Sequence, residues 1–330
     1  MMSLLVLRER LRTFYSKYDL YILAVLKFAV TLTALLLINQ NLGYVPLLRN
    51  PVIAAAAALL CAFLPAGASA AAVGIYILIH LSAVSTEVLL VAGAVLVLMF
   101  LLYFSFKPGN GWLMVLTLIA CYLHVPGALV LVAGLAFSPL AVIPMVFGLV
   151  LHQLGEAVLR NYSMLNAVAA DANSMQKLTQ VLNGLVQNQY LILFAAAIAL
   201  TVLVVYIIRR LSVSYSWVVA CILGILAFLV VTLTGNLVFD ISVRIQDVFI
   251  SAAVALVLGA AAHFMMLTVD YQGTEYVQFE DDDYYYYVKA VPKLSVSVPD
   301  VRIQKINARK IVHTQSGEGR EQDRQRTEQK

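Results

Sequence analysis

Long apolar runs recur along this chain, and they constrain its fold more than any other feature. Stretches of apolar residues recur between Leu20 and Thr268. Several of them reach the length of about 20 helical residues that spans a bilayer. Backbone groups in hydrocarbon must be paired within a helix or a closed barrel, and these runs lack the alternation of barrel strands. The runs therefore predict transmembrane helices.

Composition supports a membrane environment and excludes several other classes. Of 330 residues, 62% are apolar and 12% are charged, whereas soluble proteins have roughly half and a quarter. The lipid bilayer is therefore the first expected partner. The formal net charge of +4 is small and gives no support for a nucleic-acid partner. The cysteines Cys61, Cys121 and Cys221 lie in apolar runs without paired spacing, so we expect no disulfide framework, metal or cofactor.

We predict an all-α polytopic membrane protein with about ten membrane segments. Residues 1–19 form a basic segment, which the positive-inside rule keeps in the cytoplasm. Arg209 and Arg210 follow the eighth segment, and their charge agrees with both termini being cytoplasmic in a plasma membrane. The expected segments cover residues 20–39, 52–64, 69–85, 88–106, 112–124, 127–137, 140–158, 190–208, 217–234 and 248–268.

The membrane domain, residues 20–268, is predicted to contain one amphipathic helix on its outer side, at about 161–189. Apolar residues recur there at helical spacing: Leu165, Val168, Met175, Leu178, Leu182 and Leu185. Residues 269–313 are rich in strand-forming tyrosine and valine, and aspartates mark a turn between 276–279 and 284–291, which predicts a hairpin within a small cytoplasmic β-rich module. Residues 314–330 carry almost no apolar side chains, so we expect a disordered tail.

Two short pairs of apolar segments are each broken by proline and glycine. An offset of sixty residues aligns Cys61 with Cys121 and Gly67 with Gly127, and under the predicted topology the two copies cross in opposite directions. Secondary transporters build midplane sites from such inverted, discontinuous repeats. The alternative is that small residues match by chance and that each break is an ordinary hairpin. The candidate binding residues at the breaks are Pro65, Gly67, His124, Pro126 and Gly127.

Two further groups of residues are candidates for a site. His152 and Glu156 are four residues apart, so on a helix they share a face and form a pair that could relay a proton. An interfacial hydrogen-bonded pair is the alternative, since no third ligand for a metal follows at helical spacing. In the tail, an acidic and aromatic cluster is a candidate surface for docking a protein partner: Asp281, Asp282, Asp283, Tyr284 and Tyr285. The alternative is that the tail packs against the cytoplasmic loops while its acidic turn stays solvated.

Two segments carry a resemblance to a known family. The N-terminal stretch Glu9–Asp19 and the tail Val277–Lys293 resemble uncharacterised polytopic membrane proteins of Gram-positive anaerobes, which are often labelled ABC-type transporter permeases. The resemblance implies a permease-like membrane domain and no established activity. The motif by which permeases dock an ATPase is not present in the sequence.

Three functions remain in competition. The broken pairs favour a transport or permease component for a small solute or an envelope precursor. The outer helix and the tail favour a non-enzymatic scaffold or assembly factor of an envelope or secretion complex, with a cytoplasmic or membrane protein as its partner. An intramembrane enzyme ranks last, because the sequence has no recognisable catalytic motif. Association into a homo-oligomer is left open.

Overall fold

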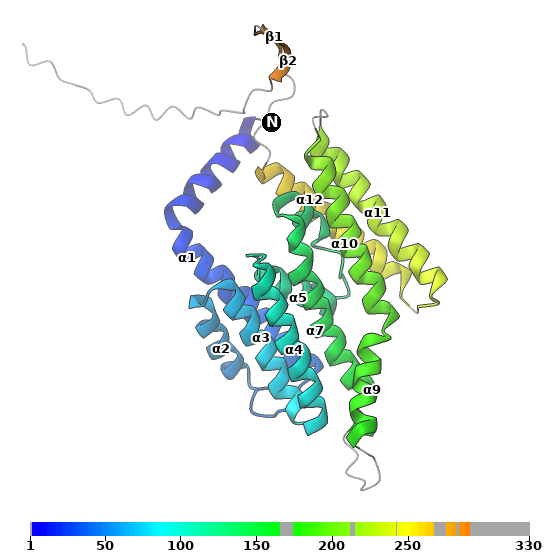
Figure 1. Cartoon of the computed structure of the whole chain (residues 1–330). Helices are drawn as coiled ribbons and strands as arrows, with labels where there is room; N and C mark the ends of the chain where they lie inside the picture. The colour runs from blue at the N-terminus through cyan, green and yellow to red at the C-terminus, as the bar shows by residue number, and fades with distance from the viewer. Residues whose placement is uncertain are drawn as a thin grey trace, which may run out of the picture. The chain divides into compact units, whose positions relative to one another are not determined.

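The computed structural model describes most of the chain, and the described part is helical apart from one hairpin. The described residues are 2–165, 174–211, 215–241, 243–266, 275–281 and 284–290. The predicted disordered tail and most of the connections around the hairpin lie outside these residues. Figure 1 shows the order of the elements.

The N-terminal half begins with a long helix that bends. Helix α1 (Met2–Asn41) contains one residue with non-helical backbone angles, Tyr18 (φ −124°, ψ 24°). The basic segment and the first span therefore form one bent helix. Asn50 caps the next helix, and Pro51 is its first residue, a position at which proline has the backbone angle of a helix and loses no hydrogen bond. The helices that follow are α2 (Pro51–Phe63), α3 (Ala66–Ser82), α4 (Thr86–Phe106), α5 (Trp112–Tyr122) and α6 (Val130–Ala136).

The C-terminal half is built mainly from four longer helices. A 3-10 turn, η1 (Pro139–Ala141), leads into α7 (Val142–Arg160), and two shorter helices, α8 (Tyr162–Leu165) and α9 (Ser174–Val186), follow. Asn188 caps α10 by accepting a hydrogen bond from the Leu191 amide. The last helices are α10 (Gln189–Arg209), α11 (Ser216–Val238) and α12 (Ile245–Met266).

Six helical segments of the described chain are long and apolar enough to cross a membrane: Val6–Asn41, Thr86–Phe106, Pro139–Arg160, Leu178–Arg209, Ser216–Val238 and Ile245–Met266. They are compatible with a multi-pass membrane protein. The predicted count of about ten segments is not confirmed. Helices α2, α3, α5 and α6 have 13, 17, 11 and 7 residues, and a full crossing needs about 20.

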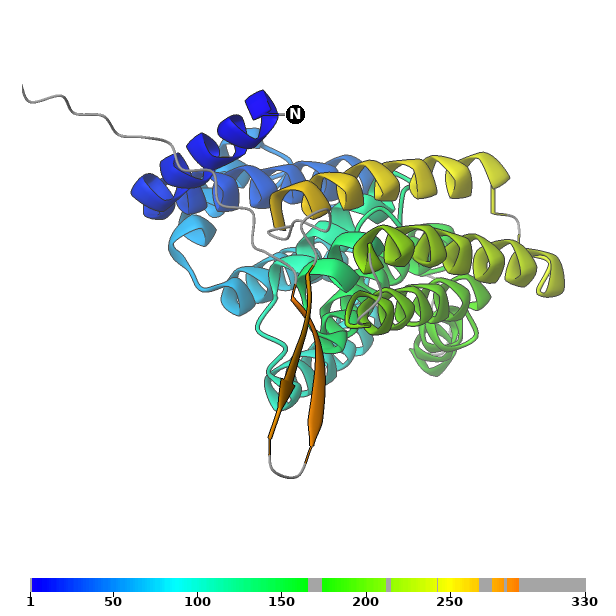
Figure 2. The same cartoon turned by 90° about the horizontal axis from the view of Figure 1, so that it is seen from above.

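Helices α5 and α7 lie between two groups of helices. One core cluster joins α1 to α4 with one face of α5 and α7, through side chains such as Leu118 and Leu151. The other joins the opposite faces of α5 and α7 to α6, α10, α11 and α12, through side chains such as Cys121 and Leu149. Figure 2 shows the C-terminal group on one side of the molecule and α2 to α4 on the other. The central pair therefore connects the two cores.

The two central helices touch backbone to backbone at Gly148. A Cβ atom at this position would overlap the carbonyl oxygen of Met114, and it would also lie 3.0 Å from the Thr117 Cβ. Close approach at glycine is the usual way in which helices associate in lipid, where burial from water gives little driving force. The crossing at Gly148 fixes the separation of α5 and α7.

The amphipathic helix predicted at 161–189 is found in two pieces, α8 and α9, and residues 166–173 between them lie outside the described chain. Its apolar side chains pack into the first core cluster, where Leu165, Val181 and Leu185 are buried. In Figure 1, α9 continues nearly in line with α10. The helix therefore belongs to the bundle, because its apolar stripe finds protein partners on α4 and α7.

The tail forms the predicted hairpin. Strands β1 (Glu275–Glu280) and β2 (Tyr285–Ala290) are antiparallel, with Val277 opposite Val288 and Phe279 opposite Tyr286. The Asp281 amide donates to the Tyr284 carbonyl oxygen at 2.9 Å and closes the turn. The boundaries match the expected strands within one or two residues, because aspartates mark the turn between two tyrosine-rich runs.

The crossing at Gly148 gives a first prediction. Gly148→Ala should destabilise the membrane domain by about 1–3 kcal/mol, because the added methyl group forces α5 and α7 apart. Thermal unfolding in detergent, followed by circular dichroism, measures the change. Gly93→Ala in α4 is the matched control: its Cβ would meet nothing within 4 Å, so helix propensity alone predicts equal or slightly higher stability. Equal melting temperatures for the two variants would contradict the role given to Gly148.

Candidate functional site

The break after α5 is a helix-ending motif with an unusual residue at its key position. The Val125 amide donates to the Ala120 carbonyl at 2.8 Å and the His124 amide to the Cys121 carbonyl at 3.0 Å, which is the hydrogen-bond pattern of a Schellman motif. The left-handed residue of that motif is normally glycine, yet here it is His124, with φ 60°. Such a conformation costs about 1 kcal/mol or more in a residue with a side chain.

The break is then held by two other helices. The Gly127 amide donates to the Ser251 hydroxyl oxygen of α12 at 2.8 Å, and both atoms are buried. A Cβ atom at Gly127 would overlap the ring of Phe228 in α11, which is fully buried and has no room to move. Helix α6 follows and is enclosed by α10, α11 and α12. The turn is thus fixed by a hydrogen bond on one side and by steric fit on the other.

A cavity of about 360 Å³ lies against this break. His124 and Pro126 line it from the break, and other lining residues come from α7, α10, α12 and the connection that precedes α12: Arg160, Tyr190, Phe194, Ile241, Val243, Arg244, Asp247, Val248 and Ser251. Its walls are therefore contributed by segments far apart in sequence. We call this space the break cavity.

A second cavity of about 370 Å³ adjoins the first, because Arg160, Tyr190 and Ile241 line both. Glu156 lies in this second cavity, and its carboxylate is 3.8 Å from the Arg160 guanidinium, an ion pair whose side chains are 29% and 73% exposed. Asn188 donates to the Gln153 side-chain oxygen at 3.0 Å and ties the start of α10 to α7. Polar groups therefore gather where α7 ends and α10 begins.

His152 lies behind these cavities, one turn before Glu156 on α7. Its ring packs edge-on against Tyr122 of α5, with ring centroids 4.8 Å apart. The His152 Nδ1 atom and the Tyr122 hydroxyl are both buried and have no hydrogen-bond partner among the described residues. Unpaired polar groups in an apolar interior are costly, which makes this pair a candidate for function.

The loop after α1 is anchored by a polar network. The Asn39 amide donates to the Leu48 carbonyl, and its side-chain oxygen accepts from Tyr76 and is 2.9 Å from His80 Nε2. Further along the loop, Tyr44 stacks on Tyr162 with ring centroids 5.0 Å apart. Burial raises the pKa of the Tyr44 phenol, and interactions with Tyr162 and Glu156 raise it further. His80 thus has a structural role, with partners at both ring nitrogens.

The first break, at Pro65 and Gly67, is built differently from the second. Lys27 donates to the Leu64 carbonyl at 3.2 Å, and Gly111 packs so closely on Ala66 that a Cβ there would lie 2.7 Å from the Ala66 carbonyl oxygen. The first break therefore lies at the start of α5, and the second follows its end. Pro65 and Gly67 line neither of the two cavities described above.

The sixty-residue offset pairs similar elements in different surroundings. Both copies form a helix, a break and a second helix: α2 and α3 in one, α5 and α6 in the other. Gly74 packs against Leu96 of α4, whereas its counterpart Gly134 packs against Val205 of α10. The repeat stays a prediction. Of its two breaks, the second lines the break cavity, whereas Pro65 and Gly67 of the first line neither of the two cavities described above.

Of the residues predicted for partner docking, Asp281, Tyr284 and Tyr285 lie at the turn of the hairpin, and Asp282 and Asp283 lie outside the described residues. The hairpin also has an apolar face that the sequence did not single out. Directly opposite residues share a face, so Val277, Phe279, Tyr286 and Val288 form one surface. Their exposed fractions are 38%, 51%, 44% and 40%.

Several residues of the break cavity were not predicted. Arg160 and Arg244 are 84 positions apart, and they reach one space because α7 packs on α10 while α10 and α12 both pack on α6. Asp247 in the first turn of α12 had a detectable signal, since acidic residues favour helix N-termini. Within the described residues, no three histidine, cysteine, aspartate or glutamate side chains gather closely enough to hold a metal ion.

Comparison with protein families, with curated proteins and with solved structures gave no match for this chain.

His124 provides the prediction for this site. His124→Gly should raise stability by about 1 kcal/mol, because glycine adopts a positive φ without steric cost. His124→Ala is the control, since it removes the imidazole but keeps a Cβ in the left-handed conformation. Melting temperatures in detergent distinguish the two. If His124→Gly is no more stable than His124→Ala, the backbone is not strained at this position.

Proposed function

We propose that the protein is a transport or permease component that admits a small solute or an envelope precursor to the break cavity. The observation that carries this proposal is the position of the cavity. It lies where a short helix ends inside the helical bundle, and charged or polar side chains from three other helices face it. Discontinuous helices beside a polar space are the usual construction of a transporter's solute site.

Two properties of the surroundings support the proposal. Non-helical backbone is tolerated at membrane depth only where protein buries it or where it borders a water-filled space. The turn at 123–129 is held by a buried hydrogen bond to α12, and it borders the break cavity. The buried His152 and Tyr122 next to it add polar groups that packing alone does not require. A helical bundle with a purely structural role would gain stability by replacing them with apolar side chains.

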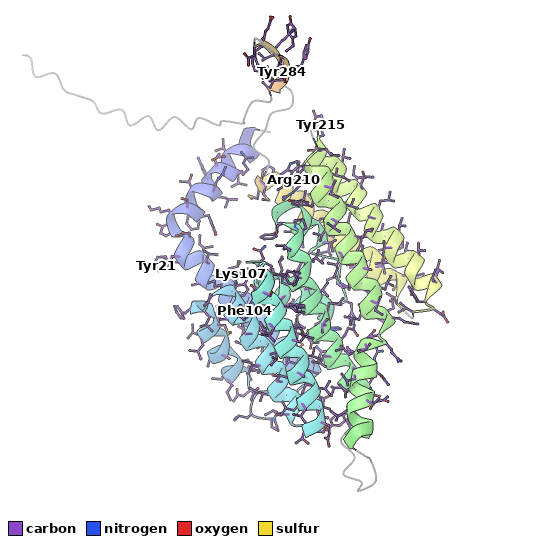
Figure 3. All side chains as sticks on the ribbon, in the orientation of Figure 1. Tyr21, Phe104, Lys107, Arg210, Tyr215 and Tyr284 are labelled. Carbon is purple, nitrogen blue, oxygen red and sulfur yellow. The ribbon has the colours of Figure 1, made fainter. Side chains whose placement is uncertain are left out.

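We further propose that the protein lies in the plasma membrane with both termini in the cytoplasm. Arg209 and Arg210 end α10, and Figure 3 places Arg210 and Tyr215 at the turn between α10 and α11. Lys107 caps the C-terminal end of α4, at the turn that leads to α5. Basic residues at such turns favour the cytoplasmic side. The break cavity, at the other end of α10, would then open toward the outside.

Thiol accessibility tests the cavity in intact cells. With Cys61, Cys121 and Cys221 replaced by alanine, Pro126→Cys should react with a membrane-impermeant maleimide added outside, since Pro126 lines the cavity. Ala133→Cys is the control: Ala133 in α6 is 0% exposed, so it should stay unlabelled. Labelling is read as a mass shift of the purified protein. Protection of both thiols, in cells and in inverted vesicles, would remove the support for transport.

A scaffold or assembly factor is the second candidate, and the hairpin favours it. A two-stranded hairpin alone is marginally stable in water. This hairpin presents four apolar side chains on one face, and Phe279 and Tyr286 form its aromatic pair near the turn, with ring centroids 6.4 Å apart. A cytoplasmic or membrane protein, or a second copy of this chain, would stabilise the hairpin by covering that face.

The two faces of the hairpin allow a matched test. Phe279→Thr with Tyr286→Thr removes the apolar pair and keeps good strand formers, so recovery of a crosslinked partner from membranes should fall about tenfold or more. Tyr287→Thr changes the opposite face, where the side chain is 79% exposed, and should leave recovery unchanged. Equal recovery from all three proteins would argue against docking through this hairpin.

A further inference from the structure

The break cavity carries more positive than negative charge. Two guanidinium groups, from Arg160 and Arg244, line it together with one carboxylate, from Asp247, among its described lining residues. Guanidinium groups stay charged at all physiological pH values. Helices α10 and α12 begin beside the cavity, at Gln189 and Ile245, but α5 and α7 end beside it, at Tyr122 and Arg160, so the partial charges of the helix ends offset one another and the arginines decide the sign. The electrostatic potential of the space therefore favours an anion.

Neither guanidinium is firmly held by the protein's own carboxylates. Arg160 is 3.8 Å from Glu156 through its Nε atom, and its side chain is 73% exposed, so this ion pair is weak. No carboxylate of the described residues lies within salt-bridge distance of Arg244. Both arginines can therefore turn their terminal N–H groups toward a ligand in the cavity.

Hydroxyl groups complete the set of donors. Tyr190 lines the cavity at the start of α10, and Ser251 lines it from α12. The Ser251 oxygen accepts from the Gly127 amide, so its own proton is left to donate elsewhere. Arginine forks and hydroxyls together match the geometry of a carboxylate or a phosphate group.

We propose that the break cavity binds the anionic group of its solute, a carboxylate or a phosphate, between Arg160 and Arg244. This inference rests on the proposed transport function and specifies its substrate class. The group can arrive from two sources, a water-soluble anion or the headgroup of an anionic lipid. Both present the same chemistry to the two arginines.

The test compares two thiol reagents of similar size and opposite charge at Pro126→Cys, in the protein without its native cysteines. These are sulfonatoethyl methanethiosulfonate, an anion, and trimethylammonioethyl methanethiosulfonate, a cation. Each rate is divided by the rate of the same reagent with free 2-mercaptoethanol. At low ionic strength, two nearby positive charges should favour the anion by about tenfold. Glutamine at both positions, R160Q with R244Q, should lower the ratio to one or below, because Asp247 is then the charged residue left in the cavity lining.

A matched control and two ligand arms complete the experiment. Arg49→Gln removes an arginine that lines a separate cavity, so it should leave the ratio unchanged. Slower labelling in inorganic phosphate or glutamate than in chloride at equal ionic strength identifies a soluble anion. Slower labelling in phosphatidylglycerol than in phosphatidylcholine vesicles identifies a lipid headgroup. Either result supports the proposal when R160Q with R244Q abolishes it.

The outcomes separate this inference from the transport function. Equal normalised rates for the two reagents would leave the cavity accessible and would overturn the anion site. A tenfold preference that survives R160Q with R244Q, in a protein with an unchanged melting temperature, would also overturn it. A thiol that reacts with neither reagent would instead contradict the accessible cavity, and the transport function with it.

Discussion

The contact between α5 and α7 at Gly148 is the constraint on which the rest of the bundle depends. These two helices contribute one face to each of the hydrophobic cores, so their separation sets the spacing of everything packed on either side. In hydrocarbon, tight van der Waals contact takes over much of the role that burial from water has in soluble proteins. Gly148 against the Met114 carbonyl gives that contact at the centre of the molecule. The break cavity lies at the end of the same helix pair.

Helix boundaries were largely predictable, because local residues determine them. Pro51 after Asn50 starts α2, and Lys107 in the left-handed conformation ends α4, each close to its expected position. The number of membrane crossings was not predictable in the same way. Helix α6 reads as apolar as any lipid-facing helix, yet Val130, Leu131 and Leu135 are fully covered by protein. Hydropathy measures avoidance of water and does not distinguish lipid from protein as the alternative.

The residues of the candidate site were likewise only partly predictable from the sequence. His124, Pro126 and Gly127 were predicted because proline and glycine mark a break, and two of them line the cavity. Pro65 and Gly67 carry the same signal at a break that Lys27 and Gly111 pack against closely. Arg160 and Arg244 required knowledge of which helices are neighbours, and no local pattern contains it. His124 in a position normally taken by glycine was unexpected, because residue type predicts backbone conformation only on average.

The hydrogen bond from the Gly127 amide to Ser251 links a turn to a helix 124 residues later in the chain. Around it the ring of Phe228 fills the space where any side chain on residue 127 would stand. Separating the turn from α12 would leave a buried amide unpaired, at a cost of about 1–3 kcal/mol or more away from water. Intermediate displacements would lose that bond without gaining another. We therefore expect the turn at 123–129 and α12 to move together, because parting them would cost a buried hydrogen bond.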